Sequence, residues 1–273
     1  SSVRVDSGVY EGAEITMFYD PMIAKLVTHG VDRGQAISTM REALDSFVIR
    51  GVGHNIPFLS SLMAHPRFVA GKLTTNFISE EYPDGFTGVS MGPDHLALIT
   101  AVAAVVHHCY QLRDQQISGR LHPAKPSSGA DWVVLIGREP HPVTVAETAS
   151  GYAVISGDSS FELTSDWKLG DPLYRALVNG RPVSVQVERN GIGYRLSHGG
   201  AQVDVQVLRP RAAELAALMP VKQPPDMSRF LLSPMPGLLV SLFAQPGEEV
   251  KAGQELAVVE AMKMENVLRA ERD

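Results

Sequence analysis

Valine occupies every second position in two stretches in the middle of the chain, residues 183–187 and 203–207. Polar residues fill the positions between, and this period of two is typical of a strand with one buried and one wet face. Six further short runs are rich in apolar, β-prone residues. Together they predict eight strands: Trp132–Gly137, Val143–Ala149, Tyr152–Ser156, Phe161–Asp166, Leu173–Val178, Pro182–Glu188, Gly193–Leu196 and Gln202–Leu208.

Turn dipeptides connect several of these strands. Asn179-Gly180, Asn190-Gly191 and Gly199-Gly200 favour tight hairpins. Consecutive hairpins make an antiparallel meander, and eight strands of this kind favour an up-and-down barrel, because closure removes the exposed sheet edges. We therefore predict a barrel over about residues 131–208.

A long apolar segment precedes the strands. It opens at Gly92-Pro93-Asp94, and proline is tolerated in the first turn of a helix. Its apolar residues cover more than one face, which is typical of a helix buried on most sides. A helix over about residues 93–118 would be roughly 39 Å long at 1.5 Å per residue. That is too long for the core of a small two-layer fold, so we expect a central helix wrapped by other elements.

The first region, residues 1–87, has a mixed α/β pattern. Short strands are predicted at Val3–Asp6, Glu14–Phe18 and Ile23–His29. Asp32 is a suitable N-cap for a helix that ends near Phe47. Asn55 is a candidate cap for a second helix, with Pro57 in its first turn and an end before His65-Pro66, because a residue before proline avoids the helical conformation.

The last region contains one prominent hairpin. A proline-containing linker over residues 221–230 leads into a strand at Leu238–Phe243. Glu255–Glu260 and Asn266–Ala270 would form the two arms of the hairpin. Ala261–Glu265 would be its tip, where Lys263 is displayed.

Composition changes this picture little. The net charge is −6, which argues weakly against nucleic acid as a partner. The apolar run Leu96–Val106 is too short to span a bilayer, so no membrane role is expected. The single cysteine, Cys109, fits a reducing compartment. The chain starts in what looks like the middle of a domain and stops in a strand-like context, and we expect it to be a fragment of a longer protein at both ends.

Few side chains suggest chemistry outside the hairpin. There is no glycine-rich phosphate loop and no Cys/His metal spacing, so no metal site is expected. His107 and His108 are adjacent on the long helix and cannot both point to one face. Trp132 and Trp167 are expected to pack in the barrel or at an interface.

The C-terminal motifs resemble those of biotin carboxyl carrier domains. Ser-Pro-Met-Pro-Gly at 233–237 is followed by Pro-Gly-Glu at 246–248 and Glu-Ala-Met-Lys-Met-Glu at 260–265. The resemblance implies that Lys263 carries biotin as an amide, and that Met262 and Met264 are recognised by a biotin protein ligase. Lipoyl domains share the fold but usually have Asp-Lys-Ala at the tip. Residues 231–273 would form only about half of a flattened carrier barrel, which we expect to be unstable in isolation.

Upstream motifs resemble the biotin-dependent acyl-CoA carboxylases. Tyr-Asp-Pro-Met-Ile-Ala-Lys-Leu at 19–26 and Thr-Thr-Asn-Phe at 74–77 are similar to the end of a biotin carboxylase domain of the ATP-grasp type. A long helix followed by eight strands, over residues 88–220, resembles the BT domain, which tethers the two subunits in propionyl-CoA and 3-methylcrotonyl-CoA carboxylases. The expected fold class is therefore multidomain α+β. The family's ATP-binding, metal-binding and catalytic residues precede the matched part, so no catalytic residue is expected here.

The resemblance implies an α subunit that uses ATP, Mg²⁺ and bicarbonate to carboxylate biotin. The carboxyl group would then pass to propionyl-CoA, giving methylmalonyl-CoA, on a carboxyltransferase β subunit in an α–β hetero-oligomer. The alternatives are 3-methylcrotonyl-CoA or geranyl-CoA as acceptor, or a non-catalytic, lipoyl-type carrier or adaptor. Bacterial cytoplasm and mitochondrial matrix both fit.

Overall fold

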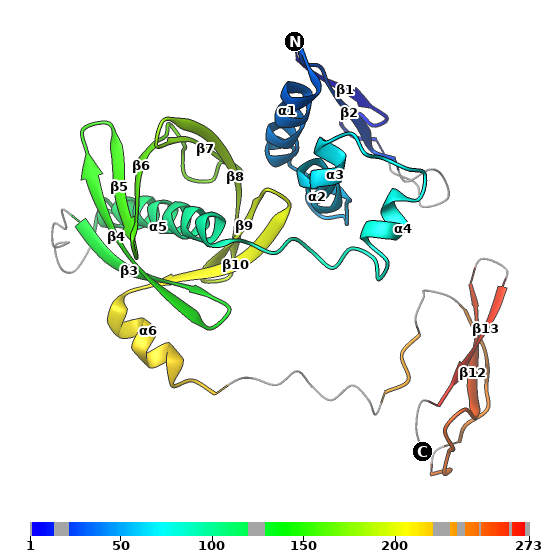
Figure 1. Cartoon of the computed structure of the whole chain (residues 1–273). Helices are drawn as coiled ribbons and strands as arrows, with labels where there is room; N and C mark the ends of the chain where they lie inside the picture. The colour runs from blue at the N-terminus through cyan, green and yellow to red at the C-terminus, as the bar shows by residue number, and fades with distance from the viewer. Residues whose placement is uncertain are drawn as a thin grey trace. The chain divides into compact units, whose positions relative to one another are not determined.

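The computed structural model divides into two compact units, residues 1–219 and 220–273. Figure 1 shows the elements of both units. The described residues are 2–13, 22–119, 129–220, 230–233, 238–245, 247–261 and 264–270.

The first unit begins with a small α/β region. Strands β1 (Val3–Ser7) and β2 (Ala24–Thr28) pair antiparallel, with Val3 opposite Thr28. Both agree with the predicted strands to within two residues. The strand expected at Glu14–Phe18 lies outside the described residues.

Helix α1 (Arg33–Ser46) begins where its capping residue predicts. The Asp32 side chain accepts a 2.8 Å hydrogen bond from the Gln35 backbone N–H, which satisfies one of the free donors of the first turn. Leu44 is buried on the apolar face of the helix.

Helix α2 (Ile56–Ala64) has proline in its first turn, as predicted, but the Asn55 side chain makes no capping hydrogen bond. The helix ends at His65, whose ψ of 129° is extended because proline follows. The His65 Nδ1 atom then caps the short helix α3 (Pro66–Val69), accepting a 3.3 Å hydrogen bond from the backbone N–H of Arg67. Helix α4 (Phe77–Glu81) completes the region.

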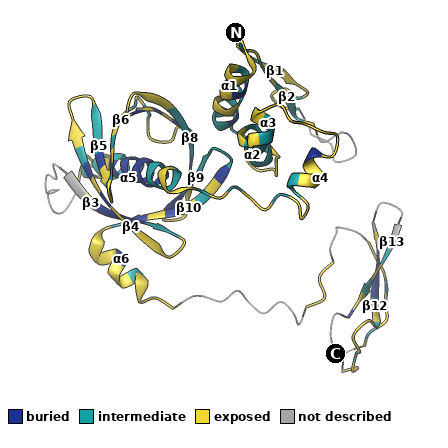
Figure 2. Ribbon diagram, in the orientation of Figure 1, coloured by how far each residue is buried: buried dark blue, intermediate teal, exposed yellow. Residues whose placement is uncertain are grey.

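Helix α5 (Pro93–Gln115) is the core of the first unit. Every residue from Ile99 to Val106 is buried, including three alanines that are 0% exposed. By length and composition alone α5 is sufficient to cross a membrane, which corrects our argument from the shorter run Leu96–Val106. Its packing in the unit gives a different reason for the apolar sequence: the barrel strands contact the helix in place of lipid (Figure 2).

Eight strands surround this helix in a closed barrel with the order β10-β3-β4-β5-β6-β7-β8-β9. They are β3 (Gly129–Ile136), β4 (Glu139–Thr148), β5 (Gly151–Ser156), β6 (Ser159–Thr164), β7 (Leu173–Val178), β8 (Arg181–Asn190), β9 (Gly193–His198) and β10 (Ala201–Leu208). Each strand pairs antiparallel with the next along the chain, and β10 pairs with β3, with Val207 opposite Val134.

The alternating valines point inward as the pattern predicts. Val185 and Val205 are 0% and 2% exposed and belong to the same core as α5. The turn at Asn179-Gly180 has positive φ at both residues, which suits the right-handed twist of the strands. Gly193 permits a close strand approach, because a Cβ atom there would lie 2.2 Å from the Val205 carbonyl oxygen.

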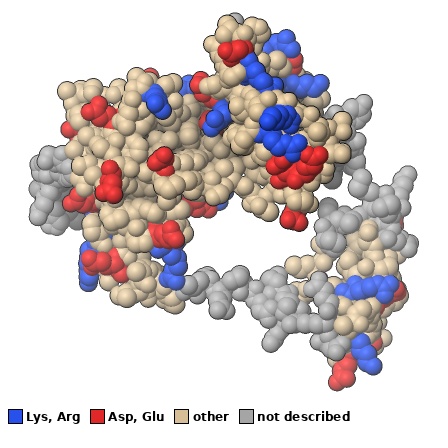
Figure 3. All heavy atoms as spheres, in the orientation of Figure 1, with Lys and Arg blue, Asp and Glu red and all other residues tan. Residues whose placement is uncertain are grey.

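After the barrel comes helix α6 (Pro210–Ala217). The second unit contains a three-stranded antiparallel sheet of β11 (Leu238–Leu242), β12 (Glu255–Ala261) and β13 (Met264–Arg269). Acidic and basic side chains are interspersed on the visible face of the first unit, without a continuous basic surface there (Figure 3).

Candidate functional site

The hairpin β12–β13 is built around the motif that carries Lys263. Its register pairs Glu260 with Glu265 and ends with Ala261 opposite Met264. The tip is therefore shorter than the predicted Ala261–Glu265, because residues 261, 264 and 265 are paired strand positions. Met262 and Lys263 follow Ala261 in the sequence and lie outside the described residues.

The base of the hairpin is well held. Val258 and Val259 are buried, and Arg269 donates 2.6 Å and 3.1 Å hydrogen bonds to the Glu255 carboxylate and the Gly253 carbonyl oxygen. The backbone N–H of Gly253 donates to the carbonyl of Ala270 at 2.8 Å. These contacts fix the end of the hairpin opposite to the motif.

Within the first unit, the adjacent histidines of α5 contact different partners. The His107 Nδ1 atom lies 3.1 Å from the Tyr194 hydroxyl, while the His108 Nε2 atom lies 3.3 Å from a Glu147 oxygen. Burial, with the nearby Arg209 and Arg189 charges, lowers the pKa of His107 to about 4. The two rings therefore connect the helix to two different barrel strands, β9 and β4.

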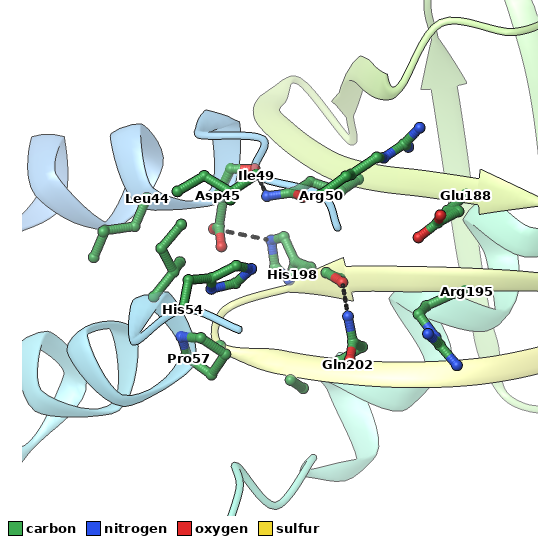
Figure 4. A pocket seen from close by; sticks show the side chains of 15 residues that line it. Leu44, Asp45, Ile49, Arg50, His54, Pro57, Glu188, Arg195, His198 and Gln202 are labelled. Carbon is green, nitrogen blue, oxygen red and sulfur yellow. Dashed lines mark hydrogen bonds and ion pairs between the residues drawn. The ribbon is translucent and has the colours of Figure 1, made fainter. Parts of the chain in front are cut away.

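A second polar cluster joins α1 to the barrel and lines a small cavity of about 60 Å³. Figure 4 shows the side chains around this cavity. The Asp45 Oδ1 atom accepts a 2.7 Å hydrogen bond from the backbone N–H of Gly199, in the β9–β10 turn. Gln186 of β8 donates to the carbonyl oxygens of Asp45 and Phe47 at 3.1 and 3.2 Å. The C-terminal end of α1 is thus bound to strand β8 and to the β9–β10 turn.

The charges at this junction are arranged around the Asp45 carboxyl. Burial raises the pKa of Asp45 to about 6, against the opposing Gly199 hydrogen bond and Arg41 charge. Burial, with the Arg41 charge, lowers the pKa of His198 to about 4. The 3.7 Å separation between Asp45 Oδ2 and His198 Nε2 is short enough for an ion pair, but the lowered pKa of His198 keeps the histidine neutral near pH 7. The pair is therefore a polar contact.

Sequence reasoning did not single out Asp45 or His198. Asp45 lies in the last turn of α1, and His198 lies 153 positions later at a hairpin turn. No local motif connects two positions that far apart. The only available signal was the Gly199-Gly200 turn, which located the hairpin but not its contact with α1.

Three family models match the chain in order. Residues 1–80 match the biotin carboxylase C-terminal domain, residues 99–222 match the propionyl-coenzyme A carboxylase BT domain, and residues 230–273 match a model described as biotin-requiring enzyme. Matched residues therefore occupy most of the chain.

Curated relatives are similar over the whole chain. The propionyl-CoA carboxylase alpha chain of Ruegeria pomeroyi is 49% identical over 273 residues, which are 100% of this chain and 40% of that protein. The mitochondrial propionyl-CoA carboxylase alpha chain of Mus musculus is 40% identical, over 98% of this chain and 38% of that protein. The mitochondrial methylcrotonoyl-CoA carboxylase subunit alpha of Dictyostelium discoideum is 29% identical, over 100% of this chain and 40% of that protein.

The chain spans about two fifths of the length of these relatives. Within that span, the small α/β region, the helix with its eight strands and the hairpin sheet follow the order of the three matched domains. The chain therefore carries, in order, segments of the biotin carboxylase C-terminal, BT and biotin-requiring domains, and it is similar over its whole length to part of the alpha chains of propionyl-CoA carboxylase.

Proposed function

We propose that this chain is part of the biotin-carrying α subunit of a propionyl-CoA carboxylase, with biotin attached to Lys263. The observation that carries the proposal is the β12–β13 hairpin, whose paired strands enclose only Met262 and Lys263 in the sequence. One end of the hairpin is held by buried and hydrogen-bonded residues, and the other end is a two-residue connection that contains the lysine. This arrangement fits a lysine that must reach a ligase and two active sites. When bound, biotin would supply the atom that carries the carboxyl group between those sites.

Attachment requires an enzyme of its own. An ordinary lysine has a pKa near 10.4, so only about one in 2,500 is neutral at pH 7. The described hairpin residues supply no base beside the motif, so a biotin protein ligase would present an activated biotinyl group. Met262 and Met264 would be the flanking residues that this ligase recognises.

The domain organisation supports transport between two sites. We assign residues 1–87 to the end of the biotin carboxylase domain, residues 88–220 to the BT domain, residues 221–230 to a linker and residues 231–273 to part of the carrier domain. The barrel with its central helix would bind a carboxyltransferase β subunit in an α–β hetero-oligomer. Such a tether raises the effective concentration of the biotinyl group at the β subunit.

ATP, Mg²⁺ and bicarbonate would be bound by the part of the relatives that this chain does not span. Propionyl-CoA is favoured over 3-methylcrotonyl-CoA as the acceptor by the higher identities to the propionyl-CoA carboxylase chains, 49% and 40% against 29%. A geranyl-CoA carboxylase subunit and a lipoyl-type adaptor are the other candidates. Bacterial cytoplasm or mitochondrial matrix would suit the enzyme.

Intact mass after co-expression with a biotin protein ligase tests the attachment site. We expect the mass of one biotinyl group, lost completely in Lys263→Arg, because arginine keeps the charge but is not a substrate for this amide formation. Lys251→Arg is the matched control, since Lys251 lies in an exposed turn of the same unit and should leave the modification intact. A lipoyl mass, or an unmodified chain, would contradict the proposal.

The acceptor is tested separately. The full α chain that contains this sequence is co-purified with its β subunit and supplied with bicarbonate, ATP and each acyl-CoA in turn. We expect propionyl-CoA to be consumed with the highest kcat/KM. A higher value for 3-methylcrotonyl-CoA or geranyl-CoA would reassign the acceptor while leaving the biotin site in place.

A further inference from the structure

Helix α6 follows the last barrel strand and precedes the second unit in the sequence, so its attachment decides where the carrier segment leaves the barrel. Its outward face is largely solvent-exposed (Figure 2): Leu215 and Leu218 are 49% and 79% exposed. Ala213 is its buried residue. Burial of one methyl group contributes little, on the order of 1 kcal/mol, so apolar packing alone is a weak anchor for this helix.

An arginine holds the first end of α6. Arg209, immediately before the helix, places its guanidinium 4.1 Å from the ring centroid of Trp132 in β3. Trp132 is only 2% exposed, and its ring and the His107 ring of α5 pack edge to face with the centroids 4.6 Å apart. A cation over a desolvated indole is a favourable interaction. The start of α6 is therefore tied through Trp132 to the central helix.

A second arginine holds the other end. Arg138 lies in the two-residue turn between β3 and β4, where Gly137 has a φ of 63°. Its Nη2 atom donates a 2.8 Å hydrogen bond to the carbonyl oxygen of Met219, just beyond the last turn of α6. Met219 lies two residues after Ala217, the last residue of α6, so this bond attaches the segment that leaves the helix to the β3–β4 turn.

We propose that Arg138 and Arg209 are positioning residues that clamp α6 to the barrel, so that the carrier segment departs from Met219 and not from Leu208. The proposal rests on the proposed function of Lys263 as a biotinyl carrier. Releasing the clamp would add residues 209–219 to the tether, and each extended residue spans up to about 3.5 Å. The tether would gain up to roughly 38 Å of reach, and the effective concentration of the biotinyl group at a fixed site would fall.

The test compares the full α chain, assembled with its β subunit, with the double variant Arg138→Ala/Arg209→Ala. Hydrogen exchange reports whether α6 is released, and it needs no biotin. Overall acyl-CoA carboxylation is then divided by the ATP-dependent carboxylation of free biotin in solution, a reaction that does not use the tether. Arg211→Ala is the matched control, because this exposed arginine of α6 pairs with Glu214 at 2.7 Å and touches neither anchor.

We expect the double variant to lose about tenfold in protection of the α6 amides, the effect of one hydrogen bond and one cation–π contact together. The coupling ratio should fall about threefold, because residues 209–219 would roughly double the length of the linker 221–230 and effective concentration declines as roughly the −3/2 power of tether length. Arg138→Lys/Arg209→Lys keeps both cations and should recover part of each effect, while Arg211→Ala should change neither.

Unchanged protection of α6 in the double variant would overturn the clamp. Increased exchange with an unchanged coupling ratio would overturn its positioning role. A parent chain without biotin on Lys263 would instead contradict the proposed function, and the exchange measurement would still decide whether the two arginines hold α6.

Discussion

The carboxylate of Asp45 in α1 accepts a 2.7 Å hydrogen bond from the backbone N–H of Gly199 in the β9–β10 turn. Arg50 adds a 2.8 Å hydrogen bond to the carbonyl of Val187 in β8. These contacts connect residues of the matched biotin carboxylase region to residues of the matched BT region. The junction is thus built from specific polar contacts at positions distant in the sequence, and its stability should respond to pH.

Replacing Asp45 by asparagine should stabilise the chain relative to the parent, by an amount that increases as pH rises. The pKa of Asp45 is raised by burial from 3.8 to about 6, so the carboxyl stabilises the folded state below about pH 4 and loses this contribution as pH rises through 6. Asparagine keeps an oxygen acceptor for Gly199 without the charge. The stability of Asp45→Asn relative to the parent should therefore increase between pH 4 and 7, by up to about 3 kcal/mol.

Urea unfolding at pH 4 and at pH 7, followed by tryptophan fluorescence, measures the stability of the variant relative to the parent. Asp158→Asn, in the exposed β5–β6 turn, is the control, and its stability relative to the parent should be the same at pH 4 and pH 7. If Asp45→Asn also behaved in this way, the buried carboxyl would not be the source of the effect.

His198 should act in the opposite direction. Burial lowers its pKa to about 4, so it stabilises the folded chain above about pH 6.5 and this contribution is lost as pH falls through 4. Between pH 4 and 6 it opposes Asp45, and the parent therefore shows a weakened pH dependence. Unfolding of Asp45→Asn across this range should give a steeper loss of stability on acidification than the parent, and His198→Gln in the same background should remove much of the added slope.

Gly200→Ala should destabilise the first unit more than Gly157→Ala. Both glycines have positive φ, 81° and 57°, so both variants carry backbone strain of about 1 kcal/mol. A Cβ atom at Gly200 would also lie 2.9 Å from the Pro57 carbonyl oxygen in α2, whereas Gly157 has nothing within 4 Å. We expect an extra loss of about 1–3 kcal/mol for Gly200→Ala. Equal losses for the two variants, measured by thermal unfolding, would show that α2 does not pack against this turn.

Ala103→Leu should disrupt the barrel core. Ala103 is 0% exposed in the middle of α5 and belongs to the core that the helix shares with the barrel strands, and leucine would add three carbon atoms there. Overpacking of this kind costs about 1–3 kcal/mol. Ala97→Leu, on a partly exposed position of the same helix, is the control and should have a smaller effect on the urea midpoint. A tolerated Ala103→Leu would indicate that the helix is not tightly enclosed.

Most of the element positions could be predicted because their causes are local. Asp32 caps α1, Pro66 ends α2, and the valines at 183–187 and 203–207 face the barrel core. Boundaries were less accurate: β12 continues to Ala261 and β13 starts at Met264, because pairing across the hairpin extends the strands into the motif. The assignment of biotin to Lys263 came from the motif and stays a prediction.

The amino-acid sequence by itself determined the strands, the long apolar helix and the carrier motif, since periodicity, capping and turn chemistry depend on neighbouring residues. Only the tertiary structure decided that Asp45 meets Gly199 and that Arg209 lies over Trp132. Those partners are separated by 154 and 77 positions, and their side chains meet because barrel closure fixes where each strand ends. The junction and the clamp on α6 are therefore properties of the closed barrel and of no single segment.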